Sequence, residues 1–235
     1  MKNIELPFIR DMFNAIAPRY DLLNRLLSLR QDVYWRRKMI SRIKIPAQAT
    51  LLDMACGTGD VILEILRQKG TGNTVIGSDF SIAMLQLADK KIKSEASFSQ
   101  IFLVAGNALQ MPFKPESFDS VTIAFGIRNI NDKLSALKAF HNMLKKDSML
   151  AILELTTPQK GFFRSLYLFY FRKILPMIGW LVSGEIKAYQ YLPDSVLNFP
   201  SSREFADIMF SAGFSNVKWQ KLTFGIATLY TGKKA

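Results

Sequence analysis

The sequence predicts an α/β fold with a mostly parallel, seven-stranded sheet that ends in an antiparallel hairpin. Between residues 50 and 155, short continuous apolar runs alternate with helical patterns, as they do in parallel sheets whose two faces are covered by helices. Near the end of the chain, two more apolar runs are joined around Gly225 by a connection that is too short for a crossover helix. The predicted strands span residues 50–56, 74–79, 100–106, 118–125, 149–155, 216–223 and 227–231.

Helices are predicted over residues 60–69, 81–93 and 133–146, with Ser81 as the N-cap of the second. Ser201 and Glu204 have the spacing of a capping box, which predicts a further helix that stops near Gly213.

The length of 235 residues suits a single domain with helical additions. Residues 1–45 are helical and basic in pattern and form an expected N-terminal cap. Residues 156–200 are an expected helical insertion before the last strands. We expect the two segments to form a lid over the carboxyl ends of the strands, where open α/β sheets bind their ligands.

Composition excludes several kinds of protein. The chain has one cysteine and one histidine, which rules out an intramolecular disulfide framework and a multi-histidine centre, so no metal is expected. Its 31 Lys and Arg against 19 Asp and Glu give a net charge of +12, which suits nucleic acid, anionic lipid or an acidic substrate. Residues 1–10 lack the apolar core of a secretory signal, and residues 174–184 are too short to span a bilayer. A cytoplasmic protein is expected.

The sharpest local motif is a glycine-rich turn between the first predicted strand and the helix after it. Gly57 and Gly59 allow a tight turn and a close approach of the backbone to a ligand. The dinucleotide fingerprint G-x-G-x-x-G fails, because Ile62 stands at the third glycine position. With Asp53 in the strand, the pattern is instead similar to the first motif of Rossmann-like, class I methyltransferases that use S-adenosylmethionine. A tight turn that binds no ligand is the alternative.

Further candidates follow the second and third predicted strands. Asp79 can accept hydrogen bonds from both hydroxyls of a ribose. In this class of methyltransferase, the residues after the third strand lie beside the adenine, and Asn107 carries the donor and acceptor that an adenine edge requires. A turn asparagine without a ligand is the alternative. The candidate cofactor-binding residues are Asp53, Gly57, Thr58, Gly59, Asp79, Asn107 and Ala108.

Three other polar residues are interpreted as structural. Cys56 lies in the glycine-rich turn but has no evident base beside it, so we expect a packed side chain rather than a nucleophile. We expect His141 to pack beside the apolar side of its helix and Asp119 to support the start of a strand.

The segment after the fourth predicted strand identifies a family. It lacks the Asn/Asp-Pro-Pro-aromatic motif of amino-group methyltransferases that act on bases. Its letters, AFGIRNI (124–130), instead resemble the UbiE/COQ5 family, also called MenG, which C-methylates the ring of polyprenylated quinols. The resemblance covers nearly the whole chain, including residues 12–24, 27–37, 153–155, 175–179, 189–195 and 222–227. The chain departs from the family at Leu23, Asp32, near Arg30 and over residues 145–148.

This resemblance implies an S-adenosyl-L-methionine-dependent quinol C-methyltransferase of menaquinone or ubiquinone biosynthesis. We favour demethylmenaquinol as the substrate, with 2-methoxy-6-polyprenyl-1,4-benzoquinol, or both quinols, as the alternative. The candidate catalytic residues are Arg128, Asn129 and Tyr20. We expect Arg128 and Asn129 to orient the quinol oxygen, because a protonated arginine favours developing oxyanion character. The alternative for Arg128 is an ion pair at the strand end, and for Tyr20, which we expect to close over the cofactor or substrate, helix packing.

The aromatic segment 161–183 is expected to contact the polyprenyl tail, with Arg164, Arg172 and Lys173 on lipid head groups, although a buried core helix is the alternative. We therefore expect an anionic membrane surface as a partner, reached from the inner face of the cytoplasmic membrane. No nucleic acid is expected, because the basic residues are spread along the chain. An RNA methyltransferase and a non-catalytic scaffold of quinone synthesis are the rival functions. A homo-oligomer or a quinone-synthesis complex is left open.

Overall fold

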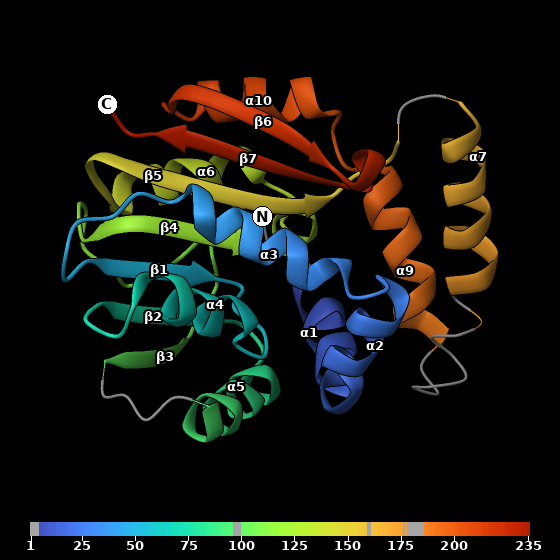
Figure 1. Ribbon diagram of the computed structural model, residues 1–235, viewed down its shortest axis with the longest axis horizontal. Coiled ribbons are helices and arrows are strands. Elements are labelled where there is room, and N and C mark those ends of the chain that lie inside the picture. Colours follow the sequence, from blue (N-terminus) through green and yellow to red (C-terminus); the bar gives the residue numbers. More distant parts are fainter. Residues whose placement is uncertain (1–4, 96–99, 159–160, 176, 178–185) are drawn as a thin grey trace.

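A seven-stranded sheet with the order β3-β2-β1-β4-β5-β7-β6 forms the centre of the protein. The computed structural model describes residues 5–95, 100–158, 161–175, 177 and 186–235. Neighbours from β3 to β5 pair in parallel, whereas β7 runs antiparallel to both β5 and β6 (Figure 1). The predicted sheet and its terminal hairpin are thus confirmed. The strands are β1 (Thr50–Met54), β2 (Thr74–Asp79), β3 (Ile101–Ala105), β4 (Phe118–Ala124), β5 (Leu144–Leu155), β6 (Ser215–Leu222) and β7 (Ala227–Lys233).

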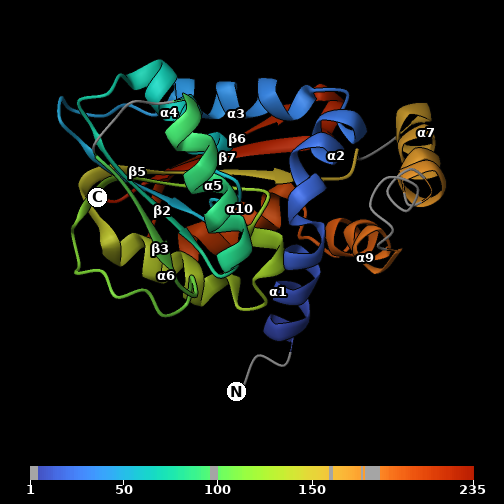
Figure 2. The same ribbon diagram turned by 90° about the horizontal axis from the view of Figure 1, so that it is seen from below.

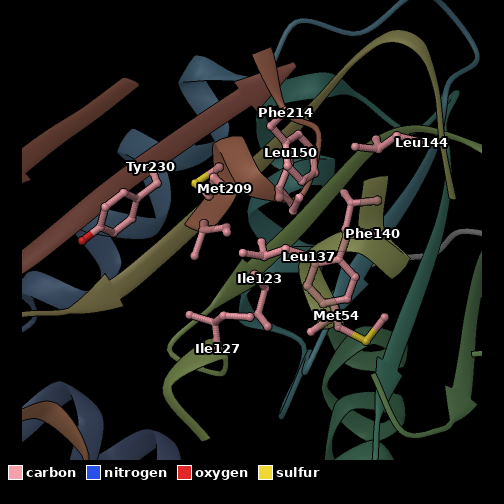
Figure 3. Packing of buried hydrophobic residues seen from close by; sticks show 14 of the residues in the cluster. Met54, Ile123, Ile127, Leu137, Phe140, Leu144, Leu150, Met209, Phe214 and Tyr230 are labelled. Carbon is pink, nitrogen blue, oxygen red and sulfur yellow. The ribbon is translucent and has the colours of Figure 1, made fainter. Parts of the chain in front are cut away.

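Helices cover both faces of the sheet (Figure 2). One face carries α3 (Gln31–Arg42), α4 (Asp60–Lys69) and α5 (Ile82–Glu95). The other face carries α6 (Lys133–Met143) and α10 (Ser202–Ser211), whose apolar side chains meet those of β4, β5 and β7 in the cluster of Figure 3. Adjacent residues of β1 serve opposite faces, because the strand is buried on both sides: Leu51 joins the first cluster and Leu52 the second.

Both predicted helix caps are present, but one helix ends earlier than predicted. Ser81 Oγ accepts a hydrogen bond from the Met84 N–H at 3.1 Å, and the capping box at Ser201 is present in full. The helix predicted over 133–146 ends at Met143, and the chain continues directly into β5. Leu144 is fully buried and pairs with Phe118 of β4, so strand pairing overrides the helical pattern there.

The remaining helices gather beyond the carboxyl ends of the parallel strands (Figure 1). They are α1 (Glu5–Ile16), α2 (Tyr20–Leu27), α7 (Phe162–Phe169), which continues as a π-helical turn to Ile174, and α9 (Ile186–Leu197). Their side chains form a third apolar cluster of Ile16, Leu23, Tyr167, Phe171, Leu175 and Val196. Residues 1–45 therefore divide: α1 and α2 join the insertion, whereas α3 packs on α4 and the sheet.

The aromatic segment 161–183 is described only in part. Residues 178–185, which include Trp180 and Leu181, lie outside the described residues. Among the helices that the structure describes, none has the length and apolarity needed to cross a bilayer.

Two phenylalanines of α10 test the packing of the sheet face. Phe205 is fully buried, whereas Phe210 is 51% exposed on the same helix. We expect Phe205→Ala to lower the free energy of unfolding by about 3–5 kcal/mol, because it removes apolar contacts and leaves a cavity. Phe210→Ala, the matched control, should change it by less than about 0.5 kcal/mol. Urea denaturation measures both values, and equal effects would contradict the packing described for α10.

Candidate active site

Two loops meet at the carboxyl ends of β1 and β4, where the strand order reverses. After β1, Ala55 and Gly57 adopt left-handed backbone conformations with φ of 53° and 54°. After β4, Phe125 does the same with φ of 59°. The loops touch: a Cβ on Gly126 would lie 2.6 Å from the Ala55 Cβ, so only glycine fits there. A crevice of this kind is where open α/β sheets bind ligands.

A small cavity lies beside these loops, and six of the candidate residues line it. They are Tyr20, Gly57, Asp79, Asn107, Ala108 and Asn129. The Asp79 carboxylate is held in place by two backbone N–H groups, from Gly57 at 2.8 Å and Ser81 at 2.9 Å. Burial raises the pKa of Asp79, and these hydrogen bonds counteract that rise. Each carboxylate oxygen keeps a lone pair with which to accept a hydroxyl.

The other three cofactor candidates do not line this cavity. Asp53 is fully buried in β1; its Oδ1 accepts a hydrogen bond from Thr122 Oγ1 at 2.7 Å, and its Oδ2 has no partner among the described residues. The Thr58 hydroxyl donates to Asp21 Oδ1 at 2.6 Å. Gly59 has φ of 85°, and α4 begins directly after it. These three residues therefore lie within or next to the glycine loop but do not face the small cavity.

A second, larger cavity of about 570 Å³ lies between the sheet ends and the helices α1, α2, α7 and α9. Its lining is mostly apolar, and its size is that of a small-molecule site. Three aromatic side chains, Phe13, Tyr20 and Phe125, line both cavities and so form the wall between them. Burial raises the pKa of the Tyr20 hydroxyl, and the nearby Arg128 charge opposes that rise only in part. Tyr20 is therefore a neutral hydroxyl within an aromatic wall.

Arg128 lies in the wall of the larger cavity and is also ion-paired. Its Nη1 lies 2.9 Å from Glu154 Oε1, its backbone N–H donates to Glu154 Oε2 at 3.0 Å, and its guanidinium donates to the Phe125 carbonyl. Glu154 is fully buried near the end of β5, so the ion pair anchors the guanidinium to this strand. Arg128 Nε has no partner within the described part of the chain. Asn129, the next residue, lines the smaller cavity, and its Oδ1 accepts a hydrogen bond from Tyr191 of α9 at 3.1 Å.

Glu154 was not singled out as a functional residue from the sequence. Two signals for it were present: a carboxylate within the predicted strand 149–155, and its place in segment 153–155 of the family resemblance. The structure shows the reason for this placement: the carboxylate anchors both the backbone and the guanidinium of Arg128.

A partly buried group of charges joins the N-terminal helices to the glycine loop. Asp60, the first residue of α4, lies 2.7 Å from Arg25, 3.2 Å from Arg36 and 2.8 Å from Lys91. Burial favours the neutral form of Asp60, but these cations outweigh it and hold the pKa of its carboxyl well below the usual range. Asp32, one of the positions at which the sequence departs from the family it resembles, is buried, and it pairs with Arg25 and with Arg36. The departure at Asp32 therefore contributes ion pairs to this group.

Three residues occupy the structural positions expected of them. The Cys56 thiol is buried, and burial raises its pKa well above the ordinary value. His141 packs edge-on against Phe214, with ring centroids 5.1 Å apart. Asp119 accepts a hydrogen bond from the Thr50 N–H at 2.8 Å.

The fold and the position of the site define the class of protein. The chain has the fold of S-adenosylmethionine-dependent methyltransferases. It is similar to one such enzyme from Thermotoga maritima, with a TM-score of 0.66 and 20% identity over 96% of this chain and 99% of that chain. It is also similar to phosphoethanolamine N-methyltransferase 2 of Haemonchus contortus in complex with S-adenosyl-L-methionine. That TM-score is 0.63, with 14% identity over 85% of this chain and 52% of that chain.

Sequence comparison identifies the family. A sequence model of the ubiE/COQ5 methyltransferase family matches residues 1–234. The chain is 48% identical to the ubiquinone/menaquinone biosynthesis C-methyltransferase UbiE of Geotalea uraniireducens, over 96% of each chain. It is 43% identical to the demethylmenaquinone methyltransferase of Thermus thermophilus, over 95% of this chain and 100% of the relative. The chain therefore belongs to the ubiE/COQ5 methyltransferase family, as its AFGIRNI segment indicated.

The buried carboxyl of Asp53 makes stability depend on pH. Burial raises its pKa from 3.8 to about 7, so in that range the native state holds a proton that the unfolded chain releases. Stability is therefore lost as the pH rises through this window. In Asp53→Asn this loss is absent, and we expect the unfolding free energy of the variant to increase relative to wild type by roughly 3 kcal/mol between pH 5 and pH 8. Urea denaturation at both pH values measures this difference.

The control for this experiment is Asp194→Asn, because Asp194 is exposed. Its stability relative to wild type should stay constant between the two pH values. A constant difference for Asp53→Asn as well would show that Asp53 does not take up a proton on folding.

Proposed function

We propose that the protein transfers a methyl group from S-adenosyl-L-methionine to a ring carbon of demethylmenaquinol. The observation that carries this proposal is the large apolar cavity with Arg128 in its wall, separated from the cofactor cavity only by aromatic side chains. Membership of the ubiE/COQ5 family supports C-methylation in quinone biosynthesis, and relatives named demethylmenaquinone methyltransferase favour the naphthoquinol.

The residues of the smaller cavity suit an adenosyl group. The fixed Asp79 carboxylate is available to two ribose hydroxyls, Asn107 and Ala108 are available to the base, and no described side chain lies closer than 4.0 Å to a Cβ built on Gly57. When bound, the cofactor supplies an electrophilic methyl group. The cavity is only about 80 Å³, below the roughly 300 Å³ of small-molecule sites, and Ile9 and Phe13 of α1 line it. Part of this lining therefore has to move apart for an adenosyl group to enter.

The larger cavity suits the quinol. A ring carbon accepts a methyl group only when it is electron-rich, so the substrate must be the reduced quinol and its hydroxyl proton must be released or polarised. In this proposal, the Arg128 guanidinium stabilises the developing charge on the quinol oxygen, and Glu154 holds the guanidinium in position. Asn129 and the neutral Tyr20 hydroxyl orient the ring at the boundary of the two cavities. The apolar lining excludes water and strengthens these interactions.

The same residues bear on the alternatives. The 2-methoxy-6-polyprenyl-1,4-benzoquinol has a similar ring oxygen and tail, so it is the second candidate substrate. RNA is disfavoured, because a polar nucleotide gains little from an apolar cavity. We also infer a peripheral position at an anionic membrane on its cytoplasmic side, since a polyprenylated substrate resides in lipid. Assembly as a homo-oligomer or within a quinone-synthesis complex is compatible with this function.

A direct assay tests the function. Purified protein is incubated with methyl-labelled S-adenosylmethionine and, in parallel, reduced demethylmenaquinol, the benzoquinol or bulk RNA. We expect label in the naphthoquinol ring, less in the benzoquinol, and none in RNA. Label in RNA alone, or in no substrate while the cofactor binds, would reject the proposal.

Replacement of Arg128 tests its role. We expect Arg128→Ala to lower kcat by about 10²–10³-fold at saturating cofactor, because the charge at the quinol oxygen is lost. Arg128→Lys, the matched control, keeps the charge but loses the fork that Glu154 holds, and should recover part of the rate. Cofactor affinity, measured by calorimetry, should stay near the wild-type value in both. Near-normal turnover of a folded Arg128→Ala protein would show that Arg128 is only a structural ion pair.

A further inference from the structure

Exposed apolar side chains surround the mouth of the larger cavity. Leu29, between α2 and α3, is 80% exposed, and Phe224, in the turn between β6 and β7, is 73% exposed. Leu166 and Phe169 of α7 are each more than half exposed. All four side chains line the same cavity, so they form an apolar rim that is continuous with its interior. We call these four residues the mouth rim.

Two residues of the mouth rim adopt a left-handed backbone conformation, which large side chains rarely adopt. Leu29 has φ of 51° and Phe224 has φ of 57°, in the left-handed region that glycine and asparagine usually occupy. Both side chains are nonetheless largely exposed to solvent. Strain of this kind is typical of sites that contact a partner.

The three chain segments that carry the mouth rim are basic. These three segments, residues 24–31, 161–177 and 218–226, contain seven Lys or Arg and no Asp or Glu. Arg25 belongs to the partly buried group of charges around Asp60. The other six are exposed: Arg30, Arg164, Arg172, Lys173, Lys218 and Lys221. Apolar tips within a basic surface are the chemistry that recognises anionic lipid.

We propose that the mouth rim docks on an anionic lipid bilayer, so that the larger cavity opens toward the membrane. The helix that carries half of the rim, α7, lies at the outer edge of the molecule in both views (Figures 1 and 2). The proposal rests on the proposed function for the identity of the lipid substrate. A quinol then enters the cavity ring first while its tail stays in the bilayer, so the tail need not be transferred through water. RNA matches the charge of this surface but not its four exposed apolar side chains.

Vesicle flotation tests the docking of the full chain. Wild type should bind phosphatidylcholine vesicles that contain about a third phosphatidylglycerol, bind neutral vesicles less, and be released from anionic vesicles by high salt. Leu29→Ser with Phe224→Ser should lower the partition coefficient at least about tenfold. Arg172→Ser with Lys173→Ser should lower it about fivefold per charge removed.

The matched control is Phe102→Ser with Phe210→Ser, which removes two exposed aromatic side chains on β3 and α10, outside the cavity lining. This control should bind vesicles as wild type does, and thermal midpoints establish that every variant is folded. Equal losses in the rim and control variants would overturn the proposal. So would absence of wild-type binding to anionic vesicles at low salt.

Two parallel measurements separate the other outcomes. If light scattering shows that Leu29→Ser with Phe224→Ser converts a dimer to a monomer while vesicles are not bound, the rim is an interface between copies and the docking proposal is overturned. Wild-type methylation of quinol in detergent micelles is assayed as well. Methylation without vesicle binding rejects docking alone. Vesicle binding that the rim variants abolish, without methylation of any quinol, supports docking and rejects the proposed function.

Discussion

The buried charge of Asp60 is the point at which the N-terminal helices are joined to the sheet. Asp60 begins α4 directly after the glycine loop. Its carboxylate forms ion pairs with Arg25 of α2, Arg36 of α3 and Lys91 of α5. Together these three cations outweigh the cost of burying the carboxylate and keep it charged. The position of α2, and with it the shape of both cavities, therefore depends on the same residue that ends the glycine loop.

The sheet and the glycine loop could be predicted from sequence because their signals are local. Continuous apolar runs define the strands, and Gly57 and Gly59 mark the turn. The larger cavity could not be predicted in this way. Its walls come from helices far apart in the chain, whose patterns do not reveal which of them pack together. The partner of Arg128 was missed for the same reason, since Glu154 lies 26 residues further along.

Arg128, in the wall of the larger cavity, is fixed by its neighbours. Arg128 is held by Glu154 and by the Phe125 carbonyl, and Phe125 itself has a left-handed backbone at the contact between the two loops. The positions of the guanidinium and of Phe125 are thus set at the ends of β4 and β5. The opposite side is built from helices packed in a cluster of their own. The cavity therefore lies between two separately packed parts of the fold, the sheet and the helices of the third apolar cluster.

The aromatic wall formed by Phe13, Tyr20 and Phe125 has a thermodynamic consequence for ligand binding. Because the same side chains form a surface of each cavity, a ligand that displaces them on one side changes the affinity of the other side. Such coupling is reciprocal: whatever factor the first ligand contributes to the second, the second contributes to the first. Two ligands that both displace this shared wall would therefore bind as a coupled pair, and the order of filling would affect the rates but not the total free energy of binding.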